Sequence, residues 1–248
     1  MKYGQLSHFS HPNHPLHLHN SDVPFNCDGC REVGLGSRFS CPPCNFDLHT
    51  HCAAAAASPA PLRHPFYPKC AFQFLPRPPG DAPRYCNACG RDAPGFLFHC
   101  RTCGFDLHPC CAALPHVLEA DGGGGGGLRL YLRRRASSPC HRCGRKGRSW
   151  SYRSGCGKYE LHVACVTEML VDSWQELYGG GGKKAAPWNG NIPRIRGAAA
   201  SHHRIGSGKG KVRRCCEVAA MAVQFVISAV LGDPTAMIAG IVGSFIFR

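Results

Sequence analysis

Residues 27–52, CDGCREVGLGSRFSCPPCNFDLHTHC, contain five cysteines and two histidines. Two Cys-x2-Cys pairs lie ten residues apart, and a His-x2-Cys pair closes the stretch. Cysteines at this density can form a disulfide framework, supply a catalytic nucleophile or bind metal ions. The arrangement of the other cysteines in the chain distinguishes among these three uses.

The same pattern returns twice along the chain. Residues 86–111 repeat every interval of the first stretch, including the ten-residue gap. A third copy opens with Cys140-x2-Cys143 and closes with His162-x2-Cys165. The three copies share a related pentapeptide, which reads NFDLH at 45–49, GFDLH at 104–108 and KYELH at 158–162. An internal repeat of this kind predicts a tandem of similar small modules.

Composition favours metal binding over disulfides. The 248 residues include 18 Cys, 15 His and 30 Gly, and only 18% are charged, which fits several small stapled units better than one large apolar core. Residues 1–20 contain no apolar run of the kind that a secretory signal needs. We therefore expect a reducing compartment, where Cys-x2-Cys pairs more often bind metal than form disulfides.

The spacing suits zinc. Two cysteines separated by two residues can both reach one ion, and a histidine three residues before a cysteine places two more ligands on one helical turn. Each complete module offers six such ligands, which is two more than one tetrahedral ion takes and two fewer than two ions take. The missing ligands must therefore lie outside the repeat. The candidates are His14 and Cys70 upstream, and His64 and His116 downstream.

At this point the residues resemble a known family. The order of ligands is similar to that of the cysteine/histidine-rich zinc module of protein kinase C. HPLHL at 14–18, CDGC at 27–30 and the FDLHxxC motif resemble its plant offshoot, the divergent C1 (DC1) domain. The resemblance covers residues 11–165 and implies small zinc-stabilised α+β modules, built from short β-hairpins and a short helix.

The resemblance also implies two interleaved sites per module. In the first module one site would use Cys27, Cys30, His49 and Cys52, and the other His14, Cys41, Cys44 and His64. In the second module the sites would be Cys86, Cys89, His108 and Cys111, and then Cys70, Cys100, Cys103 and His116.

The third copy has lost one complete site. Ser154 and Gly157 stand where the second Cys-x2-Cys pair is expected, and no His or Cys occurs in 117–139. The other site keeps all four ligands, which are Cys140, Cys143, His162 and Cys165. Cys156 lies one place out of register and is left unassigned, as is Cys110. We therefore expect about five zinc ions per chain.

Five segments follow from this interpretation. Two modules with two zinc sites each are expected at 8–64 and 65–120, and a degenerate module with one site at 128–178, all joined by Ala/Pro-rich or Gly-rich linkers. Apolar residues at helical intervals predict a helix that runs from the end of the third module to about Tyr178. Residues 179–214 form a basic linker, expected to be disordered, that either is plain solvated surface or binds anionic lipid or nucleic acid.

The apolar C-terminal segment, 215–248, is expected to form two helices joined at the GDP of 232–234. Each helix would be too short to cross the hydrocarbon core comfortably, so a re-entrant hairpin or one kinked span is favoured. Cys215 and Cys216 follow basic residues and suit palmitoylation. The alternative is a soluble hairpin that packs on the modules or on a partner.

These features favour a non-enzymatic zinc-binding adaptor. The chain has no Gly-rich phosphate loop and no Gly-x-Ser-x-Gly elbow. We expect attachment to a cytoplasmic membrane face, a protein or lipid partner, and a role in signalling. Diacylglycerol is disfavoured because the ten-residue gap lacks the length and the Gln-Gly of related lipid-binding modules. Two alternatives stay open: a PHD- or RING-type cross-braced finger, with a nuclear location, and a basic nucleic-acid-binding zinc protein.

Overall fold

The computed structural model describes residues 4–21, 23–58, 60–120 and 128–178. Within these residues it contains three four-stranded antiparallel sheets, each followed by a helix. We call residues 5–55 the first module, 62–112 the second module and 117–178 the third unit. The expected basic linker and C-terminal helical hairpin lie outside the described residues.

The first sheet sets the pattern for the other two. Its strand order is β1-β2-β5-β6, from Gln5–His8, His11–His19, Arg38–Cys41 and Phe46–His49. A two-stranded ribbon of β3 (Phe25–Asn26) and β4 (Val33–Gly34) and a 3-10 turn at Pro42–Cys44 complete the module. The first Cys-x2-Cys pair therefore lies between β3 and β4, and the second begins at the end of β5.

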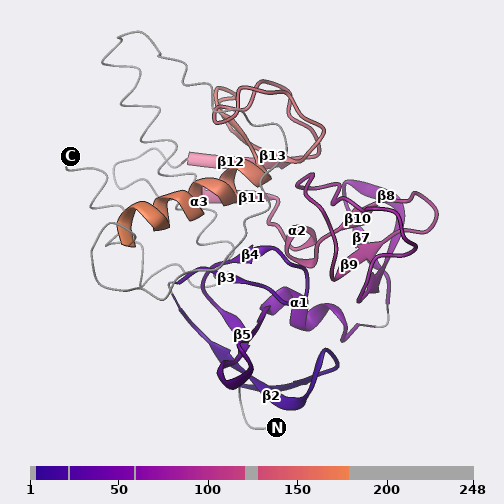
Figure 1. Cartoon of the computed structure of the whole chain (residues 1–248). Coiled ribbons are helices and arrows are strands. Elements are labelled where there is room, and N and C mark those ends of the chain that lie inside the picture. Colours follow the sequence, from indigo (N-terminus) through magenta and orange to yellow (C-terminus); the bar gives the residue numbers. More distant parts are fainter. Residues whose placement is uncertain (1–3, 22, 59, 121–127, 179–248) are drawn as a thin grey trace.

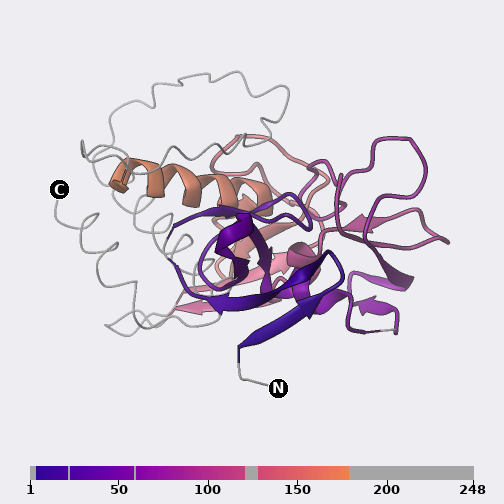
Figure 2. The ribbon, with the colours of Figure 1, turned by 60° about the horizontal axis from the view of Figure 1, so that its bottom comes forward.

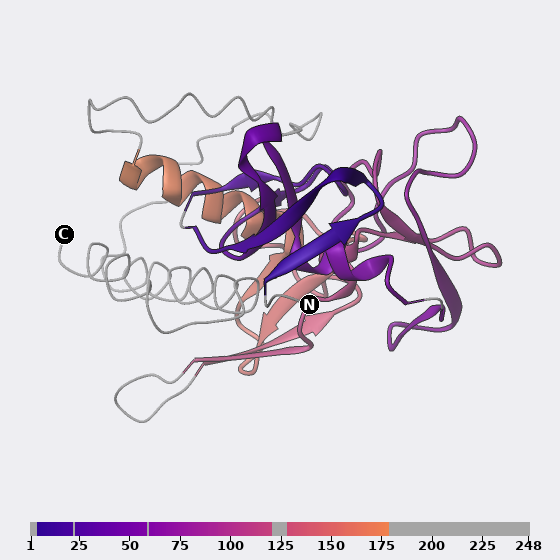
Figure 3. The same ribbon diagram turned by 90° about the horizontal axis from the view of Figure 1, so that it is seen from below.

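The other two sheets have the same topology. The second consists of β7 (Leu62–His64), β8 (Tyr67–Leu75), β9 (Leu97–His99) and β10 (Asp106–Leu107). The third consists of β11 (Val117–Ala120), β12 (Leu128–Arg133), β13 (Ser151–Ser154) and β14 (Glu160–His162). The β11–β12 hairpin projects from the rest of the structure, whereas the first two sheets form separate lobes (Figures 2 and 3).

Each helix starts directly after a histidine that ends or follows the last strand of its sheet. The helices are α1 (Thr50–Ala55), α2 (Pro109–Ala112) and α3 (Val163–Tyr178). α3 is the long helix that the spacing of apolar residues predicts, and it ends at the expected residue, Tyr178. α1 and α2 contact each other between the first two sheets (Figure 1). No helix in the described part of the chain combines the length and the apolar character needed to cross a bilayer.

The apolar core of each unit is small and lies beside cysteines. Leu48 and Leu107, the leucines of the repeated pentapeptide, are fully buried, and Leu161 is nearly so. Phe46 and Leu48 are two residues apart and therefore point to the same face of β6. Leu48 belongs to the same buried cluster as Cys27 and Cys30, and the partly buried Phe46 packs against that cluster. The cluster of the first module also includes Phe96 of the second module, and the second module and the third unit share the other cluster.

Hydrogen bonds between backbone groups connect the units. Phe96 of the second module donates its N–H to the carbonyl of Gly29 in the first, at 2.8 Å. Trp150 of the third unit donates its N–H to the carbonyl of Ala88 in the second, at 2.7 Å. Both acceptors lie inside Cys-x2-Cys pairs, so the loops that hold the cysteines also form the contacts between units.

Candidate metal centres

Each unit brings four cysteine and histidine side chains together at one point. The ligand atoms within each group lie within 4.8 Å of one another. We call these the inner groups, and they contain the residues predicted from the sequence: Cys27, Cys30, His49 and Cys52; Cys86, Cys89, His108 and Cys111; and Cys140, Cys143, His162 and Cys165. In the first two modules all four residues are buried.

The inner cysteines are held by a tight backbone turn. The N–H of Cys27 donates to the carbonyl of Glu32, and the N–H of Arg31 donates back to the carbonyl of Cys27. The equivalent pairs of bonds occur at Cys86 and at Cys140. The residue after each second cysteine is left-handed, with φ of 67° at Arg31, 77° at Gly90 and 68° at Gly144. This turn points both sulfurs of the pair toward one centre.

The other two inner ligands come from the start of the helix. His49 and His108 are the N-cap residues of α1 and α2. The cysteine three residues after each histidine lies in the helix, so both side chains reach the same inner group. The Nδ1 atom of His49 lies 3.4 Å from Cys30 Sγ, and that of His108 lies 3.5 Å from Cys89 Sγ. The Nε2 atom of His108 lies 3.1 Å from the carbonyl of Asp92, which orients the ring.

The first cysteine of each inner group has the character of a thiolate. Cys27, Cys86 and Cys140 each accept a hydrogen bond at 3.4 Å from the backbone N–H of the histidine in their own group. A hydrogen bond from Cys165, together with one from His162, lowers the pKa of Cys140 to about 3 although burial opposes the shift. Thiolate is the form of cysteine that binds zinc.

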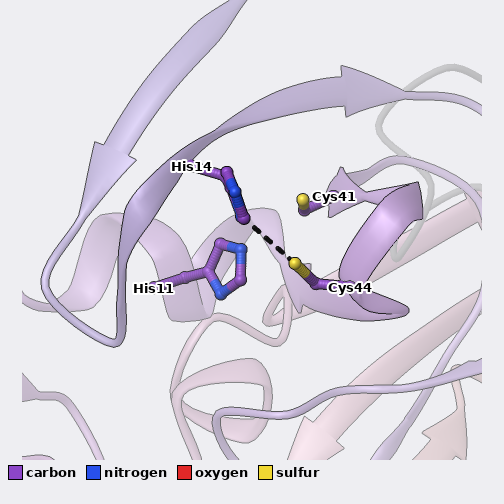
Figure 4. A group of neighbouring side chains, drawn as sticks. All are labelled: His11, His14, Cys41 and Cys44. Atoms are coloured by element: carbon purple, nitrogen blue, oxygen red, sulfur yellow. Dashed lines mark hydrogen bonds between the residues drawn. The ribbon is translucent and has the colours of Figure 1, made fainter.

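A second group in the first module combines the second cysteine pair with two histidines from an earlier strand. His11, His14, Cys41 and Cys44 lie within 4.8 Å of one another, and His14 Nδ1 is 3.1 Å from Cys44 Sγ (Figure 4). We call this the first outer group. His11 and His14 come from β2, Cys41 ends β5, and Cys44 ends the 3-10 turn that follows it. His14 and Cys44 are exposed, unlike any member of the inner group beside them.

The resemblance implied that His64 belongs to the first outer group, but the structure does not place it there. His64 ends β7 and therefore belongs to the second sheet, where its ring lies 4.7 Å from the ring of Trp150 and 5.5 Å from that of His116. Burial, and then the neighbouring His116, lower the pKa of His64 to about 4. His11 is the fourth member of the group instead, because it lies at the turn of the β1–β2 hairpin, beside the two cysteines.

The second outer group contains three sulfurs. Cys70, Cys100 and Cys103 lie together, with Cys70 Sγ 2.9 Å from Cys103 Sγ. The predicted fourth residue, His116, is not among them, because it packs against Phe66 and His64 at the other end of the hairpin.

At the aligned positions of the third unit, a serine takes the place of the first outer cysteine, and its hydroxyl accepts a hydrogen bond from the N–H of Tyr159 at 3.0 Å. Ser154 and Gly157 replace the second cysteine pair, as the sequence indicates. Nearby, the fully buried carboxylate of Glu160 accepts hydrogen bonds from the hydroxyls of Ser138 and Ser151 at 2.7 Å. Burial raises the pKa of Glu160, but these bonds and those from Ser137 outweigh it and hold the pKa at about 2.

The donor sets fit zinc. Thiolate and imidazole ligands in groups of four are those of structural zinc sites, and the four inner residues of the first two modules are shielded from water. Four complete groups and one group of three sulfurs occur in the described residues, which agrees with about five zinc ions per chain. Such groups would stabilise the modules in place of a larger apolar core.

The comparison with known families agrees with this geometry. The family model described as the C1 domain matches residues 9–53 and 63–112. These two segments are C1 domains. Each match contains one inner group and the cysteines of one outer group. The chain matches no curated protein and no solved structure.

One ligand was missed by the sequence analysis, although the chain carries a signal for it. The first C1 domain begins with His8, His11 and His14 at intervals of three, and the second begins with His64, Tyr67 and Cys70 at the same intervals. Aligning these two triplets would have placed His64 at the start of the second domain and left His11 as a ligand of the first.

Proposed function

We propose that this chain is a non-enzymatic zinc-binding adaptor, in which the metal ions hold the shape of the modules and the assembled surface binds a protein partner. The observation that carries the proposal is the closed character of the inner groups. Four protein ligands already surround each centre, whereas a catalytic zinc keeps one position for water or substrate. The C1 domain match supports the same reading, because such domains are typically interaction modules.

We also propose that residues 117–178 form a third, degenerate C1-like module. The sheet has the same strand order as the two C1 domains, and its inner group has the same ligands at the same places. Its longer helix, α3, contributes Val163, Val166 and Val171 to buried positions. This apolar burial offsets the loss of one metal group.

A rigid platform suits an adaptor. Arg91 of the second module is buried and donates to Glu32 of the first module at 2.9 Å and to Glu168 of α3 at 3.3 Å. A charge network of this kind fixes the three units relative to one another. An open groove of about 1010 Å³ lies between the first two modules and is lined by Phe9, Phe46 and Phe96. Phe9 is half exposed, as expected of a surface that contacts other molecules.

The cross-braced finger is less well supported than the adaptor. In a PHD- or RING-type arrangement the second cysteine pair takes its partners from a pair further along the chain. Here Cys41 and Cys44 lie with two histidines that precede them, and the next pair downstream belongs to another module. The ligand order of the first outer group therefore favours the C1 arrangement.

We further propose that residues 215–248 attach the protein to a cytoplasmic membrane face, with the basic residues of 183–214 binding anionic lipid headgroups. The support is the apolar sequence of this segment and the basic residues before Cys215 and Cys216.

Cell fractionation tests the attachment. The full chain is expected in the membrane fraction, and a chain that ends at residue 214 in the soluble fraction. A matched variant, in which Cys215 and Cys216 are both changed to Ser, separates acylation from insertion. A nuclear pool that is unaffected by the truncation would overturn the proposal and favour the finger or the nucleic-acid reading. Salt-dependent binding to RNA would favour the nucleic-acid-binding alternative over the cross-braced finger.

A further inference from the structure

Among the residues that the structure describes, the second outer group has three candidate ligands instead of four, and the register of the sheets shows why. In the first domain β1 pairs with β2 so that Leu6 faces Leu16 and His8 faces His11. In the second domain β7 pairs with β8 so that Leu62 faces Phe72 and His64 faces Tyr67. Both hairpins have an irregularity between these two pairs. The two hairpins therefore superimpose residue by residue.

This register places Tyr67 at the position of His11. Counting along the equivalent strands, Cys70 takes the position of His14, which is a ligand of the first outer group. Cys100 and Cys103 take the positions of Cys41 and Cys44. Three of the four ligand positions are thus kept in the second domain, and the fourth is a tyrosine.

Tyr67 is engaged elsewhere in the structure. Its side chain is buried, and its hydroxyl accepts a hydrogen bond at 3.3 Å from the Nε1–H of Trp150 in the third unit. The guanidinium of Arg134 lies over its ring, 4.6 Å from the centroid. The ring also packs against Phe72 and Phe105. The position that supplies a metal ligand in the first domain therefore supplies a contact between units in the second.

No histidine in the described ranges supplies the fourth ligand. His64 and His116 lie against each other and against Trp150 or Phe66, and neither joins the three sulfurs. His99 follows Phe98 on β9 and directs its Nδ1 to the carboxylate of Asp106 at 2.8 Å. Cys103 is partly exposed, so small molecules can approach the group from solvent.

We propose that the Cys70–Cys100–Cys103 group binds zinc with three protein ligands and keeps an exchangeable fourth position for a small external ligand, either water or a thiol. Closed structural sites have four protein ligands, whereas sites with three retain a position for water or another molecule. A thiol is the favoured competitor because soft sulfur ligands suit a centre already bound by thiolates. It would bind as a thiolate, with its proton released to solvent and the bound water displaced.

This proposal rests on the zinc-binding part of the proposed function, and the two can fail separately. Zinc content by elemental analysis tests the zinc-binding function, with about five ions expected per full chain. A Cys70→Ala variant is expected to lose one of them. If that variant retained the zinc content of the wild type, the group would hold no zinc and the proposal would be overturned, although the other four groups would still support the adaptor.

Ligand exchange tests the open position directly. In the full chain loaded with Co²⁺, whose visible absorption depends on its ligands, addition of 2-mercaptoethanol should change the spectrum by the amount expected for one site per chain. The Cys70→Ala variant should show no such change. A wild-type spectrum that does not respond to the thiol would overturn the proposal.

Two reciprocal variants identify the residue responsible. Tyr67→His should close the second outer group and abolish the response to thiol. His11→Tyr should open the first outer group and raise the response from one site to two. His11 is only partly buried, so this variant is informative even if Tyr67→His fails to fold because the contact with Trp150 is lost. Responses in His11→Tyr equal to those of the wild type would contradict the assignment.

Discussion

Single residues in the metal-binding turns show how narrowly the backbone is constrained. The turn at each first cysteine pair needs one residue with positive φ, and two of the three units use glycine there. The first domain uses Arg31, with φ of 67°. A residue other than glycine costs about 1–2 kcal/mol in this conformation. The first domain therefore carries backbone strain that the other two units avoid.

Arg31→Gly should stabilise the protein. Relief of strain is offset in part by the entropy of glycine in the unfolded chain, and by loss of the exposed ion pair with Asp28, which contributes little. We expect a net gain of about 0.5 kcal/mol in the free energy of unfolding, measured by chemical denaturation with zinc present. The matched control is Gly90→Ala at φ 77°, which should cost about 1 kcal/mol.

The space around Gly90 ensures that the Gly90→Ala control adds no steric clash. A Cβ atom at that position would meet only the Cβ of Ser149, at 3.9 Å, so the expected loss comes from the backbone alone. If Arg31→Gly lowered stability, the hydrogen bond between Arg31 and Asp28 would matter more than the conformation.

Glu160 should stabilise the third unit through its charge. Glu160→Gln keeps the size of the side chain but replaces one acceptor oxygen by a donor that faces the N–H and hydroxyl groups of Ser137 and Ser138. Hydrogen bonds to charged groups contribute more than neutral ones, so we expect a loss of about 2–4 kcal/mol in unfolding experiments. Asp172→Asn, at an exposed ion pair of the same unit, should change stability by less than about 1 kcal/mol. Equal effects would contradict this account.

At the scale of strands and helices, local patterns predicted more than long-range ones. The repeat identified the Cys-x2-Cys and His-x2-Cys pairs because each is local and follows from one turn or one helix start, and the family resemblance implied how these pairs combine into the three inner groups. The outer groups depend on which residue of a hairpin lies beside a cysteine pair about 30 residues away. Hairpin register sets that choice, and the family resemblance had implied His64 where the structure places His11.

The inner and outer groups should release zinc at different rates. All four inner residues are buried in the first two domains, whereas His14 and Cys44 of the first outer group are exposed. Chelation of a buried ion requires local opening, and each 1.4 kcal/mol of opening free energy slows release by about tenfold. Release to excess EDTA, followed with a colorimetric zinc indicator, should therefore show at least two phases.

Variants assign the phases to the groups. Cys44→Ser should reduce the amplitude of the fast phase by one ion, and Cys30→Ser should reduce that of the slow phase. A single phase for all ions, or loss of amplitude from the opposite phase, would show that burial does not control release.

The whole molecule is joined by a charge network that its sequence does not reveal. Arg91, Glu32 and Glu168 come from three different units, and no spacing rule relates them. Arg91 and Glu32 are both buried, with 5% and 8% of their surface exposed. Burial raises the pKa of Glu32, and the charge of Arg91 opposes that rise. The charge of Arg91 therefore favours the ionised form of the buried Glu32.

Arg91→Met should separate the units. Removing one member of a buried pair leaves the other charge without compensation, at a cost of about 3–5 kcal/mol, whereas replacing both by apolar residues can be nearly neutral. We expect the single variant to unfold in two transitions rather than one in denaturant, with hydrogen exchange accelerated at the contacts between units. The double variant Arg91→Met with Glu32→Met should recover most of the stability.

The nearby Arg142 provides the control for this experiment. It also pairs with Glu168 on α3, at 3.7 Å, but it lies within the third unit and is about one-third exposed. Arg142→Met should therefore cost less than about 1 kcal/mol and leave a single transition. If the Arg91 and Arg142 variants behaved alike, the units would be held together by their zinc-bearing loops and shared apolar contacts. In that case the adaptor surface would keep its shape without the buried charges.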